Sequence, residues 1–386
     1  MSNNSNIQLR KDVNFSEIEK LALRVLSVHP EKMQIPNSLS YSGGFGMEGA
    51  ALQLLATWLR TPGKHILHTG IQELESEKFE GLCNSLFGLC SLRLSDSVLL
   101  STREEVGLSD ALRPAISIFK NIRNEDLRAA FKGMYVALPA IKSPLIRGGR
   151  DREFDSPLYN NEEVVSAQKF SKLTKKAIDV IAPRASEINP TVVAHISEIL
   201  RELFVNTHRH GRSDVFGNPL GRNFRGIIFN SLNVTGERLD VISKSGGGKL
   251  ALFVTDWRPS KGEHFKAIDI TVVDSGPGYA RRWQGLDKNE LTIEMEKDAV
   301  IKCFSKHRST DNADSSGSGL SNVLRDLKAM RGWLRLRTGR TLVEKSFFNH
   351  SGSVAVEYDD IKEMDVFMEG VVFNVVIPLN TVLGGR

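Results

Sequence analysis

The segment PTVVAHISEILRELFVNTHRHG, residues Pro190–Gly211, carries the clearest helical pattern in the chain. Asn189 can serve as the N-cap, Pro190 suits the first turn, and Gly211 suits the position just past the end. Four apolar residues recur at steps of four, three and four and so share one face: Val192, Ile196, Ile199 and Leu203. The segment therefore predicts an amphipathic helix.

A row of polar residues lies beside that apolar seam. Glu202, Asn206 and His210 follow one another at steps of four, so a carboxylate, an amide and an imidazole share a face. An amphipathic helix normally places its polar side chains opposite the seam, in water. The unusual placement indicates a polar pocket, although most rows of this kind are solvated faces.

Two glycine-containing segments follow in a fixed order. The run IDITVV, residues 268–273, predicts a strand because it is rich in β-branched residues. It ends in DSGPG, residues 274–278, and further on SSGSGL, residues 315–320, precedes another helical pattern. The order is thus a helix with E-x-x-x-N, a strand ending in D-x-G-x-G, a long loop, and G-x-G-L opening a helix.

This ordered set resembles the GHKL, or Bergerat-fold, ATPases, which include gyrase B, MutL, the heat-shock chaperone ATPase domain, the sensor histidine kinases and the anti-sigma-factor kinases. Residues 202–210 look like the N box of that family, residues 274–278 like its first glycine box, and residues 317–320 like its second. The segment GVVFNVVIP, residues 370–378, is similar to its closing strand. The resemblance covers roughly residues 165–380.

The resemblance implies a role for each box residue. Glu202 would polarise the attacking water, and Asn206 would hold Mg²⁺ through its amide oxygen, the kind of ligand that this hard ion prefers. Asp274 would accept a hydrogen bond from the adenine amino group, which guanine lacks at that position. Gly276 and Gly278 would let the chain pass close to the base and hinge a lid.

The other nucleotide contacts would come from the lid, residues 277–317, and from the second box. A connection of this length is commonly a functional lid. Gly317, Ser318 and Gly319 would offer backbone N–H groups to the phosphates at a helix N-terminus. Lys306 would neutralise the γ-phosphate, a role that His307 or Arg308 could equally fill. The remaining residues expected to contact the nucleotide are Ser309, Thr310, Leu320 and His210.

Composition places the chain among ordinary globular proteins. It has 386 residues, of which 40% are hydrophobic and 25% charged, enough for two domains. A net charge of +5 permits contact with phosphates without requiring nucleic acid. Three cysteines show no disulfide or metal spacing, no apolar run has membrane-spanning length, and the polar start is no signal peptide. We therefore expect a cytoplasmic location and no integral membrane part.

The pattern predicts two domains of the α+β class. Alternating strands and helices over residues 1–142, with a last strand at 134–140, indicate a smaller N-terminal α/β domain that senses or docks a partner. Residues 143–162 are rich in turn formers and predict a linker. Residues 163–386 would form the Bergerat-type two-layer sandwich, a mostly antiparallel sheet with helices on one face. Its expected strands include residues 226–234, 249–255 and 265–273.

Glu202 favours slow Mg·ATP hydrolysis, coupled through lid closure to conformational change or partner binding. A histidine kinase would need a phospho-acceptor box, whereas His195 lies on the N-box helix itself. Two alternatives stay open: a protein kinase of the histidine-kinase or anti-sigma-factor type, and a nucleotide switch without hydrolysis. The short second box, GSGL, and the lack of a place for the family's catalytic lysine argue against efficient turnover, so the switch stays open.

The expected partners are ATP or ADP and a protein that contacts the N-terminal domain. A homodimer and a nucleic-acid partner both stay open. A signalling, stress-response or defence setting follows only by analogy with the family.

Overall fold

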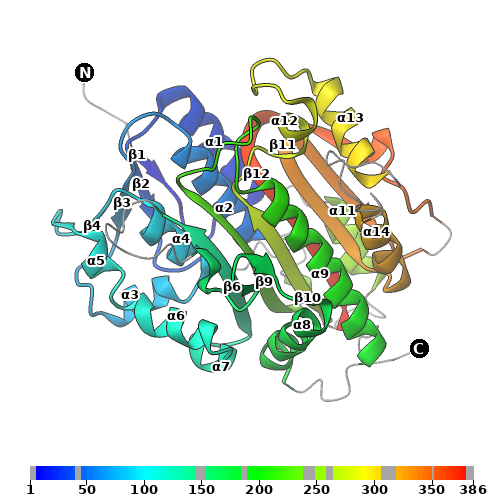
Figure 1. The fold of residues 1–386 in the computed structure, drawn as a ribbon, viewed down its shortest axis with the longest axis horizontal. Helices are drawn as coiled ribbons and strands as arrows, with labels where there is room; N and C mark the ends of the chain where they lie inside the picture. The colour runs from blue at the N-terminus through cyan, green and yellow to red at the C-terminus, as the bar shows by residue number, and fades with distance from the viewer. Residues whose placement is uncertain are drawn as a thin grey trace.

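The computed structural model of the chain describes residues 6–39, 45–143, 153–183, 189–237, 248–257, 264–305, 319–349 and 352–379. Two five-stranded sheets form within these residues, together with a two-stranded hairpin. Helices α1, α2 and α4 contact the second sheet on the side that faces the first sheet (Figure 1). The architecture is α+β, as the sequence predicts.

The first sheet is parallel except for one edge strand. In spatial order its strands are β1 (Asn6–Gln8), β2 (Lys32–Ile35), β3 (Ile66–Thr69), β4 (Ser97–Leu99) and the antiparallel β5 (Glu105–Val106). The helices of this part are α1 (Phe15–Val28), α2 (Met47–Leu59), α3 (Glu77–Cys83), α4 (Leu86–Leu94), α5 (Leu108–Ala111), α6 (Ala115–Arg123) and α7 (Leu127–Ala130). The predicted alternation of strands and helices is confirmed.

The second sheet is antiparallel at every described pairing. Its spatial order is β11 (Trp333–Ser346), β12 (Ile361–Pro378), β10 (Phe265–Asp274), β9 (Asn223–Val234) and β6 (Tyr135–Lys142). The strands predicted at residues 226–234 and 265–273 are β9 and β10. The short helices α12 (Tyr279–Gln284) and η3 (Tyr358–Asp360) lie in the connections.

Helix α9 (Pro190–His210) is the predicted N-box helix. The side chain of Asn189 accepts a hydrogen bond from the backbone N of Thr191 at 2.9 Å, and the N of Gly211 donates to the carbonyl of Thr207 at 2.8 Å. The helix therefore begins and ends where its caps predict. Its apolar seam packs against the second sheet beside α8 (Ala167–Ile181) and α14 (Gly319–Ala329).

Both faces of the second sheet are covered, whereas the sequence predicts helices on one face only. Along β10, Ile268, Ile270 and Val272 face the core formed with α8, α9, α14 and α13 (Ile293–Phe304). Val273 on the opposite face joins the core of α1, α2 and α4. The nearly continuous apolar run in β10 is the signal of a strand buried on both faces.

Helix α2 lies between the two sheets and is apolar nearly all round. Its residues Met47–Leu59 are buried except Ala50. A helix with apolar residues on every side belongs in the interior of a protein rather than at its surface. The two parts of the chain therefore share one continuous core through this helix.

Two predicted strands are placed wrongly by the sequence pattern. The strand expected at residues 134–140 of the N-terminal sheet is β6, which instead pairs with β9 along its whole length. The strand expected at residues 249–255 is helix α11 (Gly248–Asp256). A short apolar run cannot be distinguished from a buried helix by periodicity alone, and strand pairing is a long-range choice.

The sequence predicts a linker over residues 143–162. Of this segment the structure describes residue 143 and residues 153–162. It contains η2 (Glu153–Asp155) and β7 (Tyr159–Asn160), which pairs with β8 (Glu163–Val164). Glu153, Leu158 and Tyr159 are all buried. Glu153 Oε1 accepts hydrogen bonds from Arg225 Nη2 at 2.5 Å and from Arg212 Nε at 3.1 Å. This half of the segment is thus packed against β9.

We predict that Glu153→Ala lowers the free energy of unfolding by about 3 kcal/mol, because the fully buried guanidinium of Arg225 would lose its ion pair. The matched control is Asp155→Ala in the same short helix. Asp155 pairs with Arg123 at the surface, so its loss should cost under about 1 kcal/mol. Urea denaturation measures both, and equal losses would contradict a structural role for the buried pair.

Candidate functional site

Residues from three separate segments meet near the C-terminal half of α9. Asn206 Nδ2 donates to Glu202 Oε1 at 3.5 Å. The carboxylate of Glu202 lies against Gly319, the first residue of α14: a Cβ added at Gly319 would lie 1.7 Å from Oε1. A side chain at residue 319 would therefore displace the carboxylate of Glu202. The predicted N box and the last glycine of the predicted second box share one surface.

The predicted first glycine box lies at the end of the same helix. A Cβ on Gly276 would lie 2.6 Å from the Cα of Gly211, so these two backbone segments are in direct contact. The side chain of Asp274 lies beside Gly211 as well, and its Oδ1 accepts a hydrogen bond from the N of Gly276 at 2.9 Å. The D-x-G turn is thus fixed against the C-terminus of α9.

The carboxyl group of Asp274 has an unusual environment. It is 5% exposed, and burial raises its pKa to about 7, although the hydrogen bond from Gly276 and the positive charge of Arg225 both act to lower it. Arg225 lies opposite Asp274 in the pairing of β9 with β10. A buried carboxyl that backbone hydrogen bonds hold in place, here from Gly276 and Val371, can recognise a polar group that enters beside it.

Tyr279 is a member of this cluster that the sequence analysis missed. Burial raises its pKa well above the usual value, and Cys303, Asp274 and Glu202 raise it further. Its backbone N donates to Thr338 Oγ1 at 3.2 Å. Because both acidic groups act on this phenol, it belongs to the same site. Its position directly after the first glycine box is the only signal in the sequence that could have indicated it.

Of the other predicted site residues, some lie beside this cluster, one lies in the core, and the rest fall outside the described ranges. Gly278 has a φ of +80° at the start of α12, and His210 is the half-buried last residue of α9. The side chain of Leu320 is buried in the core with α9. The predicted residues that lie outside the described ranges are Lys306, Ser309, Thr310, Gly317 and Ser318.

The N-terminal part of the chain reaches the first glycine box directly. Arg60, at the end of α2, donates from Nη2 to the carbonyl of Ser275 at 3.0 Å. Gln53 Nε2 donates to the carbonyl of Gly370 at 3.3 Å, and the N of Gly370 donates to the carbonyl of Gly276 at 2.8 Å. The backbone of the D-x-G-x-G turn is therefore attached to α2 on both sides.

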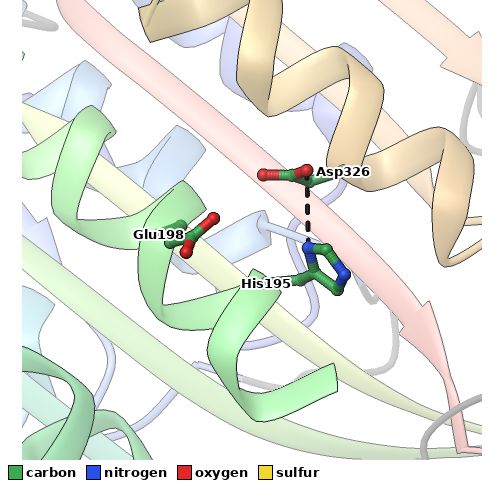
Figure 2. Close-up of side chains that lie close together, drawn as sticks. All are labelled: His195, Glu198 and Asp326. Carbon is green, nitrogen blue, oxygen red and sulfur yellow. Dashed lines mark ion pairs between the residues drawn. The ribbon is translucent and has the colours of Figure 1, made fainter. Parts of the chain in front are cut away.

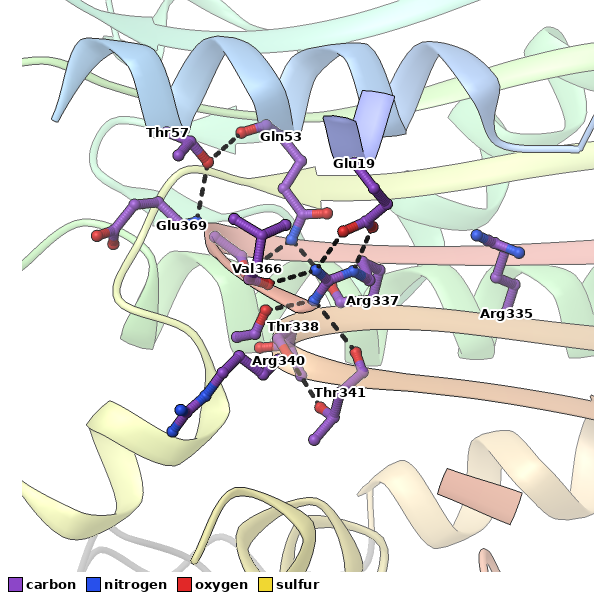
Figure 3. A network of polar contacts seen from close by, with 12 residues as sticks. Glu19, Gln53, Thr57, Arg335, Arg337, Thr338, Arg340, Thr341, Val366 and Glu369 are labelled. Atoms are coloured by element: carbon purple, nitrogen blue, oxygen red, sulfur yellow. Dashed lines mark hydrogen bonds and ion pairs between the residues drawn. The ribbon is translucent and has the colours of Figure 1, made fainter. Parts of the chain in front are cut away.

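A buried arginine organises the neighbouring contacts between α1, β11 and β12. Arg337 donates from Nε and Nη2 to the two carboxylate oxygens of Glu19 at 2.9 and 3.0 Å, and from Nη2 to the carbonyl of Val366 at 2.8 Å. Figure 3 shows Gln53 and Thr57 of α2 beside this network, with Thr57 reaching the N of Glu369. Bidentate pairing of this kind fixes both position and angle.

The sequence matches no known protein-family model, and no curated protein matches it significantly. Within the described residues, no helix is both long and apolar enough to cross a membrane. What the site does must therefore be inferred from its own residues and their geometry.

The raised pKa of Asp274 predicts a pH dependence of stability. The folded protein keeps this proton up to a pH of about 7, whereas the unfolded chain releases it near 3.8, so the stabilising contribution is lost as the pH rises between these values. Between these pH values Asp274 should make the free energy of unfolding fall by up to about 1.4 kcal/mol per pH unit, and Asp274→Asn should remove this contribution. Urea denaturation over this pH range measures it, and a wild-type slope in the variant would refute the assignment.

Proposed function

We propose that this protein binds Mg·ATP at the surface formed by Glu202, Asn206, Asp274 and Gly319, and that it hydrolyses the nucleotide slowly. One observation carries the proposal: residues far apart in the sequence, which resemble the successive boxes of a Bergerat-fold ATPase, lie near the C-terminal half of α9. The antiparallel sheet with α8, α9 and α14 on one face is compatible with that fold.

Asp274 would recognise the adenine amino group. Its Oδ1 is already engaged by Gly276, so the carboxyl is held in one orientation. An incoming amino group would supply a donor to a buried acceptor, and a base that presents a carbonyl there would be rejected. The lid expected over residues 277–317 would cover the base, with Gly278 as a hinge at its start.

Asn206 and Glu202 would act at the phosphate end. The amide oxygen of Asn206 is a hard ligand for Mg²⁺, and the carboxylate of Glu202 would orient water for attack on the γ-phosphate. The start of α14, at Gly319, would direct backbone N–H groups toward the phosphates.

The contacts of α2 favour one of the alternatives, a nucleotide switch, as a second candidate function. Arg60 and Gln53 attach the N-terminal part of the chain to the turn that follows β10. A protein partner that moves α2 would therefore alter the adenine site, and nucleotide binding would act back on the partner surface to the same extent. Transfer of the phosphoryl group to protein stays the third alternative.

The test of hydrolysis compares wild type with Glu202→Ala in phosphate release and in ATP binding. We expect the variant to bind ATP while its phosphate release falls by about a hundredfold or more, since a positioned base contributes about that much. Asp179→Ala, which removes an exposed carboxylate from α8, is the control and should keep both properties.

The other outcomes of that test separate the alternatives. Binding without phosphate release in the wild type would favour the switch, and a protein labelled from γ-labelled ATP would favour the kinase. If neither protein bound nucleotide, the proposed function would be wrong.

The coupling of α2 to the site gives a second prediction. Arg60→Ala should weaken ATP binding severalfold, because it removes a charged donor from the carbonyl of Ser275, a bond of about 1.5–3 kcal/mol. Lys120→Ala, an exposed change on α6, should leave the affinity unchanged. Titration with a fluorescent ATP analogue measures both, and unchanged affinity in Arg60→Ala would show that α2 does not position the turn.

A further inference from the structure

A second polar cluster joins α9 to α14, well before Glu202 along the helix. His195 and Glu198 are three residues apart on α9, and Asp326 is on α14. Figure 2 shows the three side chains in the space between the two helices. One potential ligand atom from each of the three lies within 4.8 Å of the others. None of these residues belongs to the nucleotide site proposed above.

Two side chains of this cluster are spaced as ligands of one ion would be: that of Asp326 is buried, and that of His195 is 33% exposed. His195 Nδ1 lies 3.4 Å from Asp326 Oδ1, and this nitrogen is buried without a hydrogen-bond partner among the described residues. Metal–ligand distances of about 2.0–2.1 Å in a tetrahedral site put neighbouring ligand atoms about 3.4 Å apart. The two atoms therefore stand where two ligands of one metal ion would stand.

The surroundings allow a third ligand and favour a cation. Glu198 is exposed, so its carboxylate can change rotamer to complete the site, and a fourth position is left for water. A neutral imidazole and two carboxylates carry two negative charges. Arg325 Nε lies 3.5 Å from Asp326 Oδ1, but its side chain is 67% exposed and can turn into solvent.

We propose that His195, Glu198 and Asp326 form a binding site for a divalent transition-metal ion, with Zn²⁺ as the best match. An imidazole ligand suits Zn²⁺ and is foreign to Mg²⁺, which prefers oxygen atoms and several waters. The bound ion would bridge α9 and α14, and so fix the helix whose first residue contacts Glu202. The site stands on its own geometry and does not depend on the proposed ATP binding.

The test measures Zn²⁺ binding to the chelator-stripped full chain without nucleotide, by isothermal titration calorimetry. We expect one ion per chain, and a loss of affinity of more than about tenfold in both His195→Ala and Glu198→Gln, since even outer partners of metal ligands are worth that much. His264→Ala is the matched control: it removes an exposed histidine elsewhere and should bind like wild type.

Melting temperatures and the Co²⁺ absorption spectrum provide two further tests of the proposed metal site. Zn²⁺ should raise the melting temperature of the wild type and of His264→Ala but not of His195→Ala. Co²⁺ should give tetrahedral visible absorption that His195→Ala lacks. The proposal is overturned if the wild type binds no Zn²⁺, if His195→Ala and Glu198→Gln bind it as tightly as wild type, or if excess Mg²⁺ displaces it. Because Glu198 is exposed, its variant should fold even if changes at the buried Asp326 do not.

Discussion

The burial of α2 between the two sheets is the constraint on which the rest of the structure depends. Its large apolar side chains Leu52, Leu55 and Trp58 are fully buried, and burial of each such side chain contributes about 1.5–3 kcal/mol to the free energy of unfolding. On the side of the second sheet that faces α2, apolar side chains such as Val273 and Val372 join the shared core. The polar side chains that also lie there, among them Arg337 and Asn374, are buried and hydrogen-bonded. A surface helix on one face could be lost at modest cost, whereas the loss of α2 would expose the interior of both sheets.

The same helix explains why a site formed by α9 and β10 is attached to the N-terminal part of the chain. α2 ends beside the turn at Ser275, so its last polar side chains meet backbone groups that an ordinary loop would leave to water. On the other face, α9 packs along α14, and their contacts include Glu202 with Gly319 and His195 with Asp326. The proposed ATP site thus lies where contacts from both faces converge.

Local signals in the sequence were enough to predict α9 and β10, because caps and periodicity are short-range patterns. The ordered boxes were enough to predict that Glu202, Asn206, Asp274 and Gly276 lie in one region. These signals were not enough for α11, because a short apolar run fits a strand as well as a helix. They were also not enough for β6 or the second covered face, which depend on contacts between distant segments. Tyr279, Arg60 and Gln53 were missed for the same reason: each acts through partners that only the folded chain brings near. The roles of Lys306, Ser309, Thr310, Gly317 and Ser318 remain predictions from the resemblance.

The ion pair of Glu19 with Arg337 joins residues 318 positions apart in the chain. Contacts between residues so far apart in the chain form slowly. The chain must first lose the conformational entropy of closing a long loop, and only then does the contact lower the free energy. During synthesis, α1 and α2 leave the ribosome long before β11 and β12 exist to cover them. The side of α2 that packs against β10 and β12 is therefore covered only after the last strands of the chain have been made.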